Sequence, residues 1–394
     1  MKYMGSKRHM LENGLGEILR SQLPHAKRFI DPFAGSGGVI NYVAVERKFK
    51  KPIIAGDLQK YSVVLARAVI GRTAKVDVER IKKSWIELAK KEVEKSTLYI
   101  KSELLDKDYS GDIKKQVMMS RKLCESPSKT GPIWNAYGGH YFSPKQAIVF
   151  DYLLKNIPNS SPNKDICLAA LIIAASRCAA APGHTAQPFQ PTKGAGKFIK
   201  ISWGIDVFKS CEAALKELAP MHAQKKGEAH VMDAEKLIPK LKEGDLVFID
   251  PPYSGVQYSR FYHVLETIAR GKCGEVSGVG RYPAIKERPQ SKFSNTSQSL
   301  KALDDLLVAL AKRRVMVIFT FPKGKASNGL SGDKVAEYSQ KYFKLSKRRT
   351  HRRVISGKFS TLGGNNKKLQ KNSKVKKSRI DSEELVLLLK PKGK

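Results

Sequence analysis

The sequence predicts an α/β protein whose doubly wound sheet is interrupted by an inserted, mostly helical domain. Three observations lead to this prediction. A strand, a glycine-rich turn, a helix and a second strand follow one another near the start of the chain. A block at 73–227 lacks that alternation, and the alternation resumes at 228. We therefore expect a discontinuous α/β domain at 1–72 and 228–394, with a second domain inserted at 73–227.

The opening elements follow from apolar runs and their breaks. A strand at 28–31 leads into the turn, and a helix starts at about residue 36. A second strand at 52–56 ends in Asp57, and another helix runs to Gly71. This order of elements is typical of the first part of a doubly wound sheet.

The block at 73–227 differs from the flanking sequence in composition and in its secondary-structure pattern. It contains Lys- and Glu-rich helical patterns, a glycine- and aromatic-rich loop at 130–146, and an alanine-rich helix at 165–181 that breaks at a Pro-Gly pair. After it, a strand, a short helix and a second strand reach residue 249. We therefore expect helices to dominate the insert and the α/β pattern to continue behind it.

The last part of the chain predicts a helix and a strand at 299–321, then a closing antiparallel pair at 341–359 and 383–391. The residues between this pair, 361–379, are polar, Gly/Asn-rich and basic. We expect a mobile loop there. It either contacts backbone phosphates without sequence preference or is only a solvated run of charge.

Charge is the strongest compositional signal. Lys and Arg number 73 against 36 Asp and Glu, which gives a formal net charge of +37. Such an excess is costly in self-repulsion, so nucleic acid is the expected partner. A generally basic surface is the alternative explanation. An anionic membrane is disfavoured, because no terminal segment is strongly amphipathic.

The expected cellular compartment and the expected absence of a metal site both rest on motifs that the sequence lacks. No apolar run approaches the roughly 20 residues that span a bilayer, and the opening MKYMGSKRHM has no stretch suited to secretion. We expect a cytoplasmic protein without membrane contact. The cysteines are too scattered for a zinc site or a disulfide framework, so we expect reduced thiols and no metal. They lie at 124, 167, 178, 211 and 273.

The turn DPFAGSGG at 31–38 is the first candidate site. Gly35, Gly37 and Gly38 let the backbone approach a ligand where a Cβ atom would clash. The turn lacks the Gly-x-Gly-x-x-Gly pattern of dinucleotide binders and the Gly-Lys-Ser/Thr of P-loops. By itself it is equally compatible with an ordinary tight turn.

Two aspartates are further candidate residues for the site at the glycine turn. Asp57, at the end of the second strand, can accept hydrogen bonds from the ribose hydroxyls of a nucleoside, or it can cap the helix that follows. Its combination with the glycine turn favours a nucleoside ligand. Asp233 follows a strand in the same way. It either caps the next short helix or accepts a hydrogen bond from an adenine amino group.

The motif Asp250-Pro251-Pro252-Tyr253 ends an apolar strand and is the most specific signal. An exocyclic amine of a base is a poor nucleophile, because its lone pair is delocalised into the ring. The Asp250 carboxylate and the Pro251 carbonyl can accept its two hydrogens and align the lone pair with an electrophilic methyl group. Tyr253 offers a flat face for an unstacked base. Positioning then does the chemistry, without a metal or a covalent intermediate.

Together these motifs resemble the Dam-like, or alpha-group, DNA adenine-N6 methyltransferases. The opening KYMGSK is similar to the N-terminal cofactor motif of that family, and the resemblance covers about 1–72 and 228–390. It implies a Rossmann-like methyltransferase sheet and makes the insert at 73–227 the DNA-recognition element. It also implies S-adenosyl-L-methionine as the cofactor, with contacts from Tyr3, Gly5, Lys7, Asp31, Pro32, Phe33, Ala34, Gly35, Ser36, Gly37, Asp57 and Asp233.

Two loops are candidates for nucleic-acid contact. In the insert, His184, Gln187 and Gln190 are suited to reading phosphates and base edges, although a His in a Pro-rich loop is often a packing residue. After the tetrad, Tyr258 and Arg260 begin a segment that is rich in Tyr, Arg and His. That segment, with Tyr262 and His263, either covers the flipped base or forms the packing face of a helix.

The resemblance implies methylation of adenine N6 in double-stranded DNA after base flipping, in a restriction-modification or phage-defence setting. A separate restriction or defence-complex subunit is then a possible partner. Cytosine N4 and RNA adenine stay open as substrates, because the same acceptors serve any exocyclic amine. A non-catalytic DNA-binding methylase scaffold is the alternative from another functional class. The sequence indicates neither the recognition site nor the oligomeric state.

Overall fold

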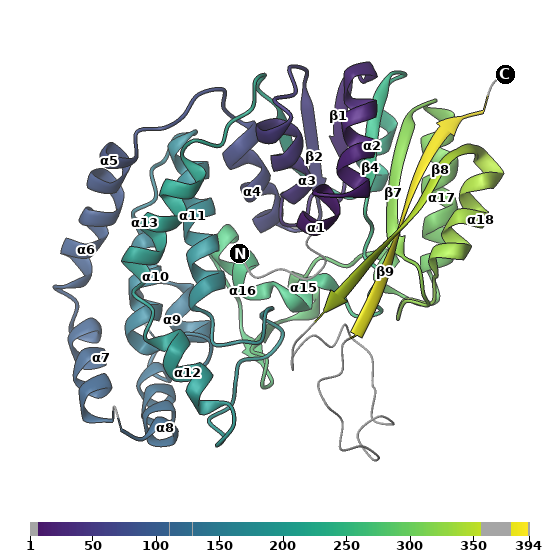
Figure 1. Cartoon of the computed structure of the whole chain (residues 1–394). Helices are drawn as coiled ribbons and strands as arrows, with labels where there is room; N and C mark the ends of the chain where they lie inside the picture. Colours follow the sequence, from purple (N-terminus) through teal and green to yellow (C-terminus); the bar gives the residue numbers. More distant parts are fainter. Residues whose placement is uncertain (1–6, 110, 128, 356–379, 393–394) are drawn as a thin grey trace, which may run out of the picture. The chain divides into compact units, whose positions relative to one another are not determined.

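The computed structural model describes residues 7–109, 111–127, 129–355 and 380–392. The chain forms two compact units, each assembled from separate segments. A helical unit contains Gln59–Ala229 and Ser259–Pro289, and a sheet unit contains Lys7–Leu58, His230–Tyr258 and the chain from Gln290 onward. Figure 1 colours the chain by residue number, so the segments that belong to each unit can be found from their colours.

A seven-stranded sheet dominates the sheet unit and confirms the α/β class. β1 pairs in parallel with β2 and β4, and β4 pairs in parallel with β7. β9 is antiparallel to both β7 and β8, which confirms the predicted closing pair. In spatial order the strands are β3 (Glu228–Val231), β2 (Ile53–Asp57), β1 (Arg28–Asp31), β4 (Asp245–Ile249), β7 (Met316–Pro322), β9 (Ile380–Pro391) and β8 (Phe343–Ile355).

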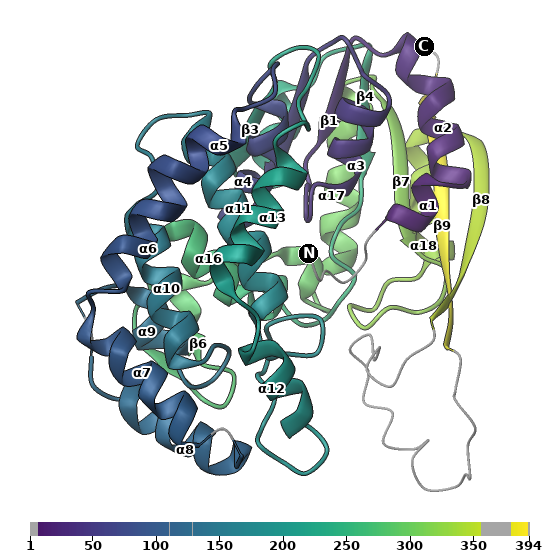
Figure 2. The ribbon, with the colours of Figure 1, turned by 60° about the vertical axis from the view of Figure 1, so that its left-hand side comes forward.

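Side chains alternate between the two faces of this sheet and are buried on both. Helices α17 (Ser299–Lys312) and α18 (Gly332–Tyr342) pack on one face, through a core that includes Ile30, Val247, Ile249, Val317, Phe319, Leu385 and Leu387. The opposite face carries Phe29, Phe248, Ile318 and Leu388, which are also buried. Over it lie α1 (Arg8–Leu11), α2 (Gly14–Gln22) and α3 (Gly38–Asn41) (Figure 2).

Short elements complete the sheet unit. They are η1 (Leu23–His25), η2 (Tyr42–Glu46), α14 (Ala234–Leu237), η4 (Ile238–Lys240) and η6 (Lys292–Ser294). Helix α18 is not among the elements expected from the sequence. Its N-terminus is capped by the Ser331 hydroxyl, which accepts a hydrogen bond from the Lys334 backbone N–H at 3.3 Å.

The helical unit is built around α11 (Asn163–Cys178), nearly all of which is buried. Its small alanines let α4 (Lys60–Ile70), α13 (Val207–Leu218) and α16 (His263–Arg270) pack against it. The other elements are α5 (Val78–Ile81), η3 (Lys82–Ile86), α6 (Glu87–Val93), α7 (Thr97–Asp108), α8 (Ile113–Cys124), α9 (Pro132–Tyr137), α10 (Pro144–Lys155), α12 (Gly196–Trp203), α15 (Tyr258–Phe261), η5 (Ile285–Glu287) and a hairpin of β5 (Val276–Ser277) and β6 (Tyr282–Pro283).

The helical unit is longer than the predicted insert at 73–227, because it also takes in α4 and the residues 259–289. The role of the insert as a separate recognition domain stays a prediction. In the part of the chain that the structure describes, no helix has both the length and the apolar character needed to cross a membrane. The predicted loop at 361–379 lies outside the described residues.

One ion pair fixes the register at the centre of the sheet. Arg28, at the start of β1, donates from Nε to Asp245 Oδ1 at 2.8 Å and from Nη2 to Oδ2 at 2.5 Å. Asp245 starts β4, is buried, and also accepts from the Lys242 backbone N–H at 2.8 Å. A two-pronged pair of this kind holds the beginnings of β1 and β4 side by side.

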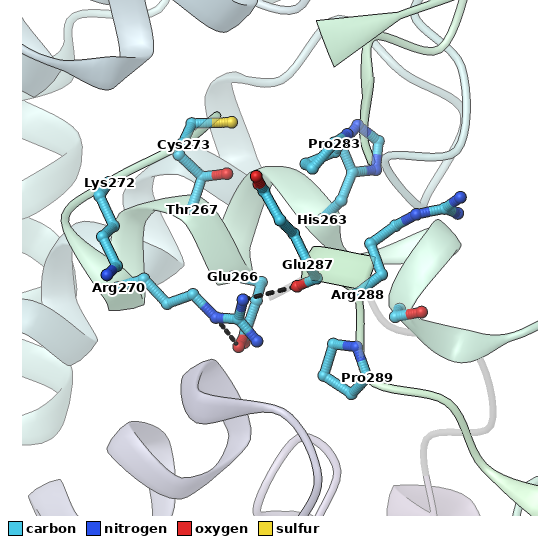
Figure 3. Close-up of a pocket in the computed structure, with 11 residues that line it drawn as sticks. His263, Glu266, Thr267, Arg270, Lys272, Cys273, Pro283, Glu287, Arg288 and Pro289 are labelled. Atoms are coloured by element: carbon cyan, nitrogen blue, oxygen red, sulfur yellow. Dashed lines mark hydrogen bonds and ion pairs between the residues drawn. The ribbon is translucent and has the colours of Figure 1, made fainter. Parts of the chain in front are cut away.

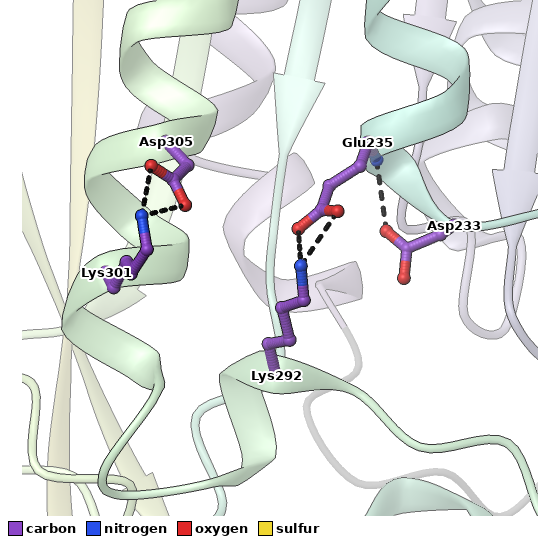
Figure 4. Close-up of polar contacts among 5 residues, drawn as sticks. All are labelled: Asp233, Glu235, Lys292, Lys301 and Asp305. Carbon is purple, nitrogen blue, oxygen red and sulfur yellow. Dashed lines mark hydrogen bonds and ion pairs between the residues drawn. The ribbon is translucent and has the colours of Figure 1, made fainter.

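We expect Asp245→Ala to lower the free energy of unfolding of the sheet unit by about 2–4 kcal/mol, because it leaves the Arg28 guanidinium without its buried partner. Urea unfolding followed by fluorescence and circular dichroism would measure the loss. Asp305→Ala is the matched control, because it breaks an exposed pair between Lys301 and Asp305 (Figure 4). It should cost less than about 1 kcal/mol. Equal losses in the two variants would contradict the role of the Arg28 pair.

Candidate active site

Acidic side chains gather where the parallel strands end. Asp31 ends β1, Asp57 ends β2, and Asp250 directly follows β4. Asp31 is only 1% exposed, and its Oδ1 accepts a hydrogen bond from the Phe33 backbone N–H at 3.1 Å. Burial raises the pKa of Asp31 well above its ordinary value, and the charges of Asp250 and Asp57 raise it further. Asp31 therefore holds its proton more tightly than an exposed aspartate does.

The glycine turn between β1 and α3 is tied to β2. Gly35 and Gly37 have φ angles of 51° and 75°, which a side chain would strain. The Gly35 N–H donates to Asp57 Oδ2 at 2.9 Å, and the Ala34 N–H donates to the Gly56 carbonyl at 3.0 Å. The structure thus brings the predicted glycine turn and the predicted ribose acid together. Their contact with a cofactor stays a prediction.

Asp233 caps a helix in this structure. Its Oδ1 accepts from the Glu235 backbone N–H at 3.0 Å at the start of α14 (Figure 4). Glu235 in turn pairs with Lys292 at 2.7 Å. The capping alternative is therefore realised. Asp233 Oδ2 takes no part in that cap, and the predicted cofactor contact of this residue stays untested.

The Asp-Pro-Pro-Tyr segment is braced by Asn328, a buried residue after β7. The Asn328 side-chain amide donates to the Pro252 carbonyl at 3.2 Å and to the Phe293 carbonyl at 3.0 Å. Its backbone N–H reaches the Tyr253 carbonyl at 3.4 Å. Asn328 thus donates hydrogen bonds to the carbonyls of Pro252 and Tyr253. It does not bond to the carbonyl of Pro251, which is the predicted acceptor for a substrate amine.

Aromatic rings hold Tyr253 in place. Its ring meets Phe321 of β7 edge-on, with 6.3 Å between the centroids, and meets Tyr258 in the same way at 6.3 Å. Burial raises the pKa of Tyr253, so its hydroxyl stays protonated near neutral pH. Tyr258, predicted to contact nucleic acid, thus lies beside the last residue of the tetrad.

Asp250 is held by a cation and a hydroxyl. Lys7 Nζ lies 3.0 Å from Asp250 Oδ1, and the Thr320 hydroxyl donates to the same oxygen at 2.8 Å. Lys7 Nζ also lies 2.9 Å from Glu384 Oε2. Burial raises the pKa of Asp250, an effect that the Lys7 charge opposes. Burial alone would lower the pKa of Lys7, but the carboxylates of Asp250 and Glu384 raise it above its ordinary value.

Lys7 was predicted to contact the cofactor. In this structure its ammonium group is engaged with the two carboxylates, and its side chain is only 5% exposed. The predicted cofactor contact of Lys7 stays a prediction. Tyr3 and Gly5, the other residues of that motif, lie outside the described residues.

In the helical unit, the predicted loop is attached to α15. The Thr185 backbone N–H and hydroxyl both donate to the Phe261 carbonyl, at 2.7 Å and 2.8 Å. The His184 ring packs on the Phe261 ring at 5.2 Å, and burial lowers the pKa of His184. Gln187 is exposed, whereas Gln190 accepts from the Arg121 guanidinium at 3.1 Å.

The β5–β6 hairpin joins this cluster. The Tyr282 hydroxyl donates to the Ala186 carbonyl, and the Arg260 guanidinium lies 4.6 Å from the centre of the Tyr282 ring. Arg288 lies 5.5 Å from the same centre. Four separate segments thus converge: the loop at 183–190, α15, the hairpin and the residues that follow it. Together they present cations beside hydrogen-bonding side chains.

Tyr262 and His263 are packing residues. Both are buried, and the Tyr262 ring lies 5.5 Å from Tyr61. The His263 ring is 5.0 Å from Tyr282 and 5.6 Å from Tyr137, and burial lowers its pKa to about 4. The helix-packing alternative therefore holds for these two residues.

His263 also borders a hollow in which Arg270 contacts two other lining residues, Glu266 and Glu287 (Figure 3). Arg270 Nε lies 2.7 Å from Glu266 Oε1, and Arg270 Nη1 donates to the Glu287 carbonyl at 2.6 Å. Arg270 therefore links α16 to the chain after the hairpin.

Comparison with known proteins identifies the family. A family model described as D12 class N6 adenine-specific DNA methyltransferase matches residues 3–161 and 189–316. The chain belongs to this family. The predicted adenine-N6 methyltransferase family is thereby confirmed, and membership implies a methyl donor. The matched residues include the glycine turn, Asp57 and the tetrad.

Individual relatives agree with this assignment. Type II methyltransferase M.NlaIII of Neisseria lactamica is 27% identical over 334 residues, which cover 78% of this chain and 79% of that protein. Modification methylase LlaI of Lactococcus lactis subsp. lactis is 23% identical over 332 residues, covering 81% of this chain and 46% of LlaI. M.FokI of Planomicrobium okeanokoites is 24% identical over 327 residues, covering 81% and 44%. The chain spans about half the length of LlaI and M.FokI.

Three features of this D12-class chain escaped the sequence analysis. Asn328 braces the tetrad from a loop, Glu384 reaches Lys7 from the closing strand, and Tyr282 anchors a two-stranded hairpin. Only Asn328 had a local signal, because it lies in the Gly/Ser/Asn-rich segment after β7. The other two depend on strand register and on contacts between distant segments.

We expect Lys7→Met to lower the free energy of unfolding by about 3 kcal/mol near neutral pH, because it leaves two carboxylates without their shared cation. Without Lys7, the folded-state pKa of Asp250, which burial already raises, rises further above its unfolded value. The variant therefore regains stability as the pH falls, and the difference from the unmodified protein shrinks near pH 5. Urea unfolding at both pH values tests this. Lys301→Met, which breaks an exposed pair, is the control and should show no such dependence. A pH-independent loss in Lys7→Met would contradict the prediction.

Proposed function

We propose that the protein is an S-adenosyl-L-methionine-dependent methyltransferase that acts on adenine N6 in double-stranded DNA after base flipping. The observation that carries this proposal is the braced tetrad at the end of β4. There the contacts of Asp250 with Lys7 and Thr320 both fall on Oδ1. Oδ2 of Asp250 and the carbonyl of Pro251 are the acceptors we assign to the substrate amine. D12-class membership supports the same activity.

The tetrad supplies acceptors and a platform rather than a covalent group. Asp250 Oδ2 and the Pro251 carbonyl accept the two N6 hydrogens, which directs the nitrogen lone pair away from the ring. With S-adenosyl-L-methionine bound, these two acceptors would hold N6 in line to receive the methyl group that the cofactor supplies. N6 would then carry a positive charge until one of its hydrogens was lost to solvent as a proton. The Tyr253 ring, fixed by Phe321, supports the face of the flipped base.

The carboxyl edge of the sheet fits the proposed cofactor. S-adenosyl-L-methionine, when bound, supplies an electrophilic methyl group on a positively charged sulfur. The positive φ angles of Gly35 and Gly37 keep that turn free of side chains, and Asp57 has the acceptors for ribose hydroxyls. We assign Asp233 to the adenine side through Oδ2.

DNA contact is assigned to the cluster in the helical unit. The net charge of +37 favours a polyanion, and Arg260, His184 and Gln187 lie on segments that share the hairpin anchor. Gln190, in the same loop, and Tyr258, which lies beside Tyr253 in the sheet unit, complete the predicted set. The names of LlaI, a modification methylase, and M.NlaIII, a type II methyltransferase, support a restriction-modification setting. A cytoplasmic location and a separate restriction or defence subunit as partner belong to the same proposal.

Two kinds of experiment separate this proposal from its rivals. Nucleoside analysis after incubation with labelled cofactor distinguishes N6-methyladenine from N4-methylcytosine, and parallel DNA and RNA substrates distinguish the polymers. Calorimetry with S-adenosyl-L-methionine distinguishes an enzyme from a non-catalytic scaffold. The proposal fails if the protein binds the cofactor but produces no N6-methyladenine on mixed-sequence DNA.

Asp250→Ala should lower kcat by about 10²- to 10⁴-fold, because N6 loses its charged acceptor. Cofactor affinity should change by less than about threefold, a difference below roughly 0.7 kcal/mol. Single-turnover kinetics and calorimetry measure the two quantities. Asp305→Ala, at an exposed carboxylate, should leave both unchanged. Parallel losses of turnover and cofactor binding in Asp250→Ala would argue against a catalytic role.

Arg260→Gln should weaken DNA binding across all sequences and reduce the slope of log K against log salt by about 1, because one phosphate contact is lost. Fluorescence anisotropy over a series of salt concentrations gives this slope. Arg177→Gln is the control, because Arg177 lies on α11 and pairs with Glu217. An unchanged slope in Arg260→Gln would remove this residue from the interface.

A further inference from the structure

Glu384 reaches the carboxyl edge of the sheet because β9 is antiparallel. The parallel strands β1, β4 and β7 deliver their C-terminal ends to that edge, whereas β9 delivers its beginning. The register pairs Glu384 with Pro322, two residues beyond Thr320 on β7. Paired residues share a face of the sheet, and residues two apart on one strand do so as well. Glu384 therefore lies on the face of Thr320, the residue whose hydroxyl binds Asp250.

The ion pair with Lys7 is well protected. The side chains of Lys7 and Glu384 are 5% and 18% exposed, and their charged atoms lie 2.9 Å apart. Lys7 Nζ is also 3.0 Å from Asp250 Oδ1. One ammonium group is thus shared between a carboxylate of the proposed tetrad and a carboxylate that the tetrad does not contain.

We propose that Glu384 is a positioning residue for methyl transfer: it restrains the Lys7 ammonium group on Oδ1 of Asp250 and so keeps Oδ2 open to the substrate amine. This inference rests on the proposed function of the same site. A lysine that faces a single carboxylate is free to bridge both of its oxygens. The second carboxylate draws the ammonium group to one side. Thr320 acts with it, because its hydroxyl also binds Oδ1.

The negative charge of Glu384 has a second effect, on the transition state of methyl transfer. The carboxylates of Asp250 and Glu384 with one ammonium group leave one negative charge uncompensated. That charge lies where N6 becomes positive during methyl transfer, so it stabilises the transition state. Without Glu384, Lys7 would neutralise Asp250 completely. Glu384 is also among the groups that raise the pKa of Asp250, after the larger effect of burial.

The test compares Glu384→Gln with Glu383→Gln. Glu383 is the preceding residue on β9 and pairs with Lys323 at 2.9 Å, with both side chains about two-fifths exposed. We expect Glu384→Gln to lower kcat by about tenfold to a hundredfold, with cofactor affinity and the KM for DNA changed by less than about threefold. The acidic limb of the pH profile of kcat should move to lower pH, because a group that raises the Asp250 pKa is gone. Glu383→Gln should leave kcat and the profile unchanged.

A merely structural role would lower the unfolding temperature of Glu384→Gln and leave the pH profile in place. That result overturns the proposal, and so does a kcat within about threefold of the unmodified value. Loss of kcat together with the acid shift, at an unchanged unfolding temperature, supports it.

A crystal structure of Glu384→Gln keeps this inference separate from the proposed function. In the variant, Lys7 Nζ should lie within about 3.2 Å of both Asp250 oxygens. Retention of Nζ on Oδ1 alone would overturn the positioning role. This measurement needs no turnover. If the unmodified protein produces no N6-methyladenine, the proposed function fails, while the position of Lys7 still decides the role of Glu384.

Discussion

The candidate site depends on the reversal of strand order between β1 and β4. The chain builds the sheet outward from β1 on one side and from β4 on the other, so the carboxyl ends of these neighbouring strands adjoin without a covering connection. Asp31 and Asp250 occupy those two ends. The pair between Arg28 and Asp245 fixes the same two strands at their beginnings, and it therefore also fixes the register on which the distance between the acids depends.

Much of this arrangement was predictable because its signals are local. The proline pair ends β4 and places Asp250 at the edge, and the glycines after Asp31 require a tight turn wherever the chain runs next. Asp57 then follows from the second strand. The bounds of β1 and β2 agree with the predicted strands to within a residue. Each of these inferences uses only a short stretch of chain and the known geometry of parallel sheets.

The remaining parts were not predictable from short stretches. Glu384 reaches Lys7 through the register of an antiparallel strand, and register is set by pairing rather than by composition. Tyr282 lies in a two-residue strand whose hydroxyl finds a carbonyl in a distant loop. For Asp233 the sequence left two roles open, because a helix cap and a ligand contact both need a carboxylate at this strand end. The structure shows that one of its oxygens caps α14.

The position of β9 also affects when the centre can form during synthesis. Lys7 and Glu384 are separated by 377 positions in the sequence. A growing chain at about 5–20 residues per second makes Lys7 at the start, and the glycine turn and Asp250 long before β9. Until β9 pairs with β7, the lysine has only the tetrad carboxylate as its partner. The proposed arrangement of two carboxylates around one ammonium group can therefore form only after β9 has been synthesised and has paired with β7.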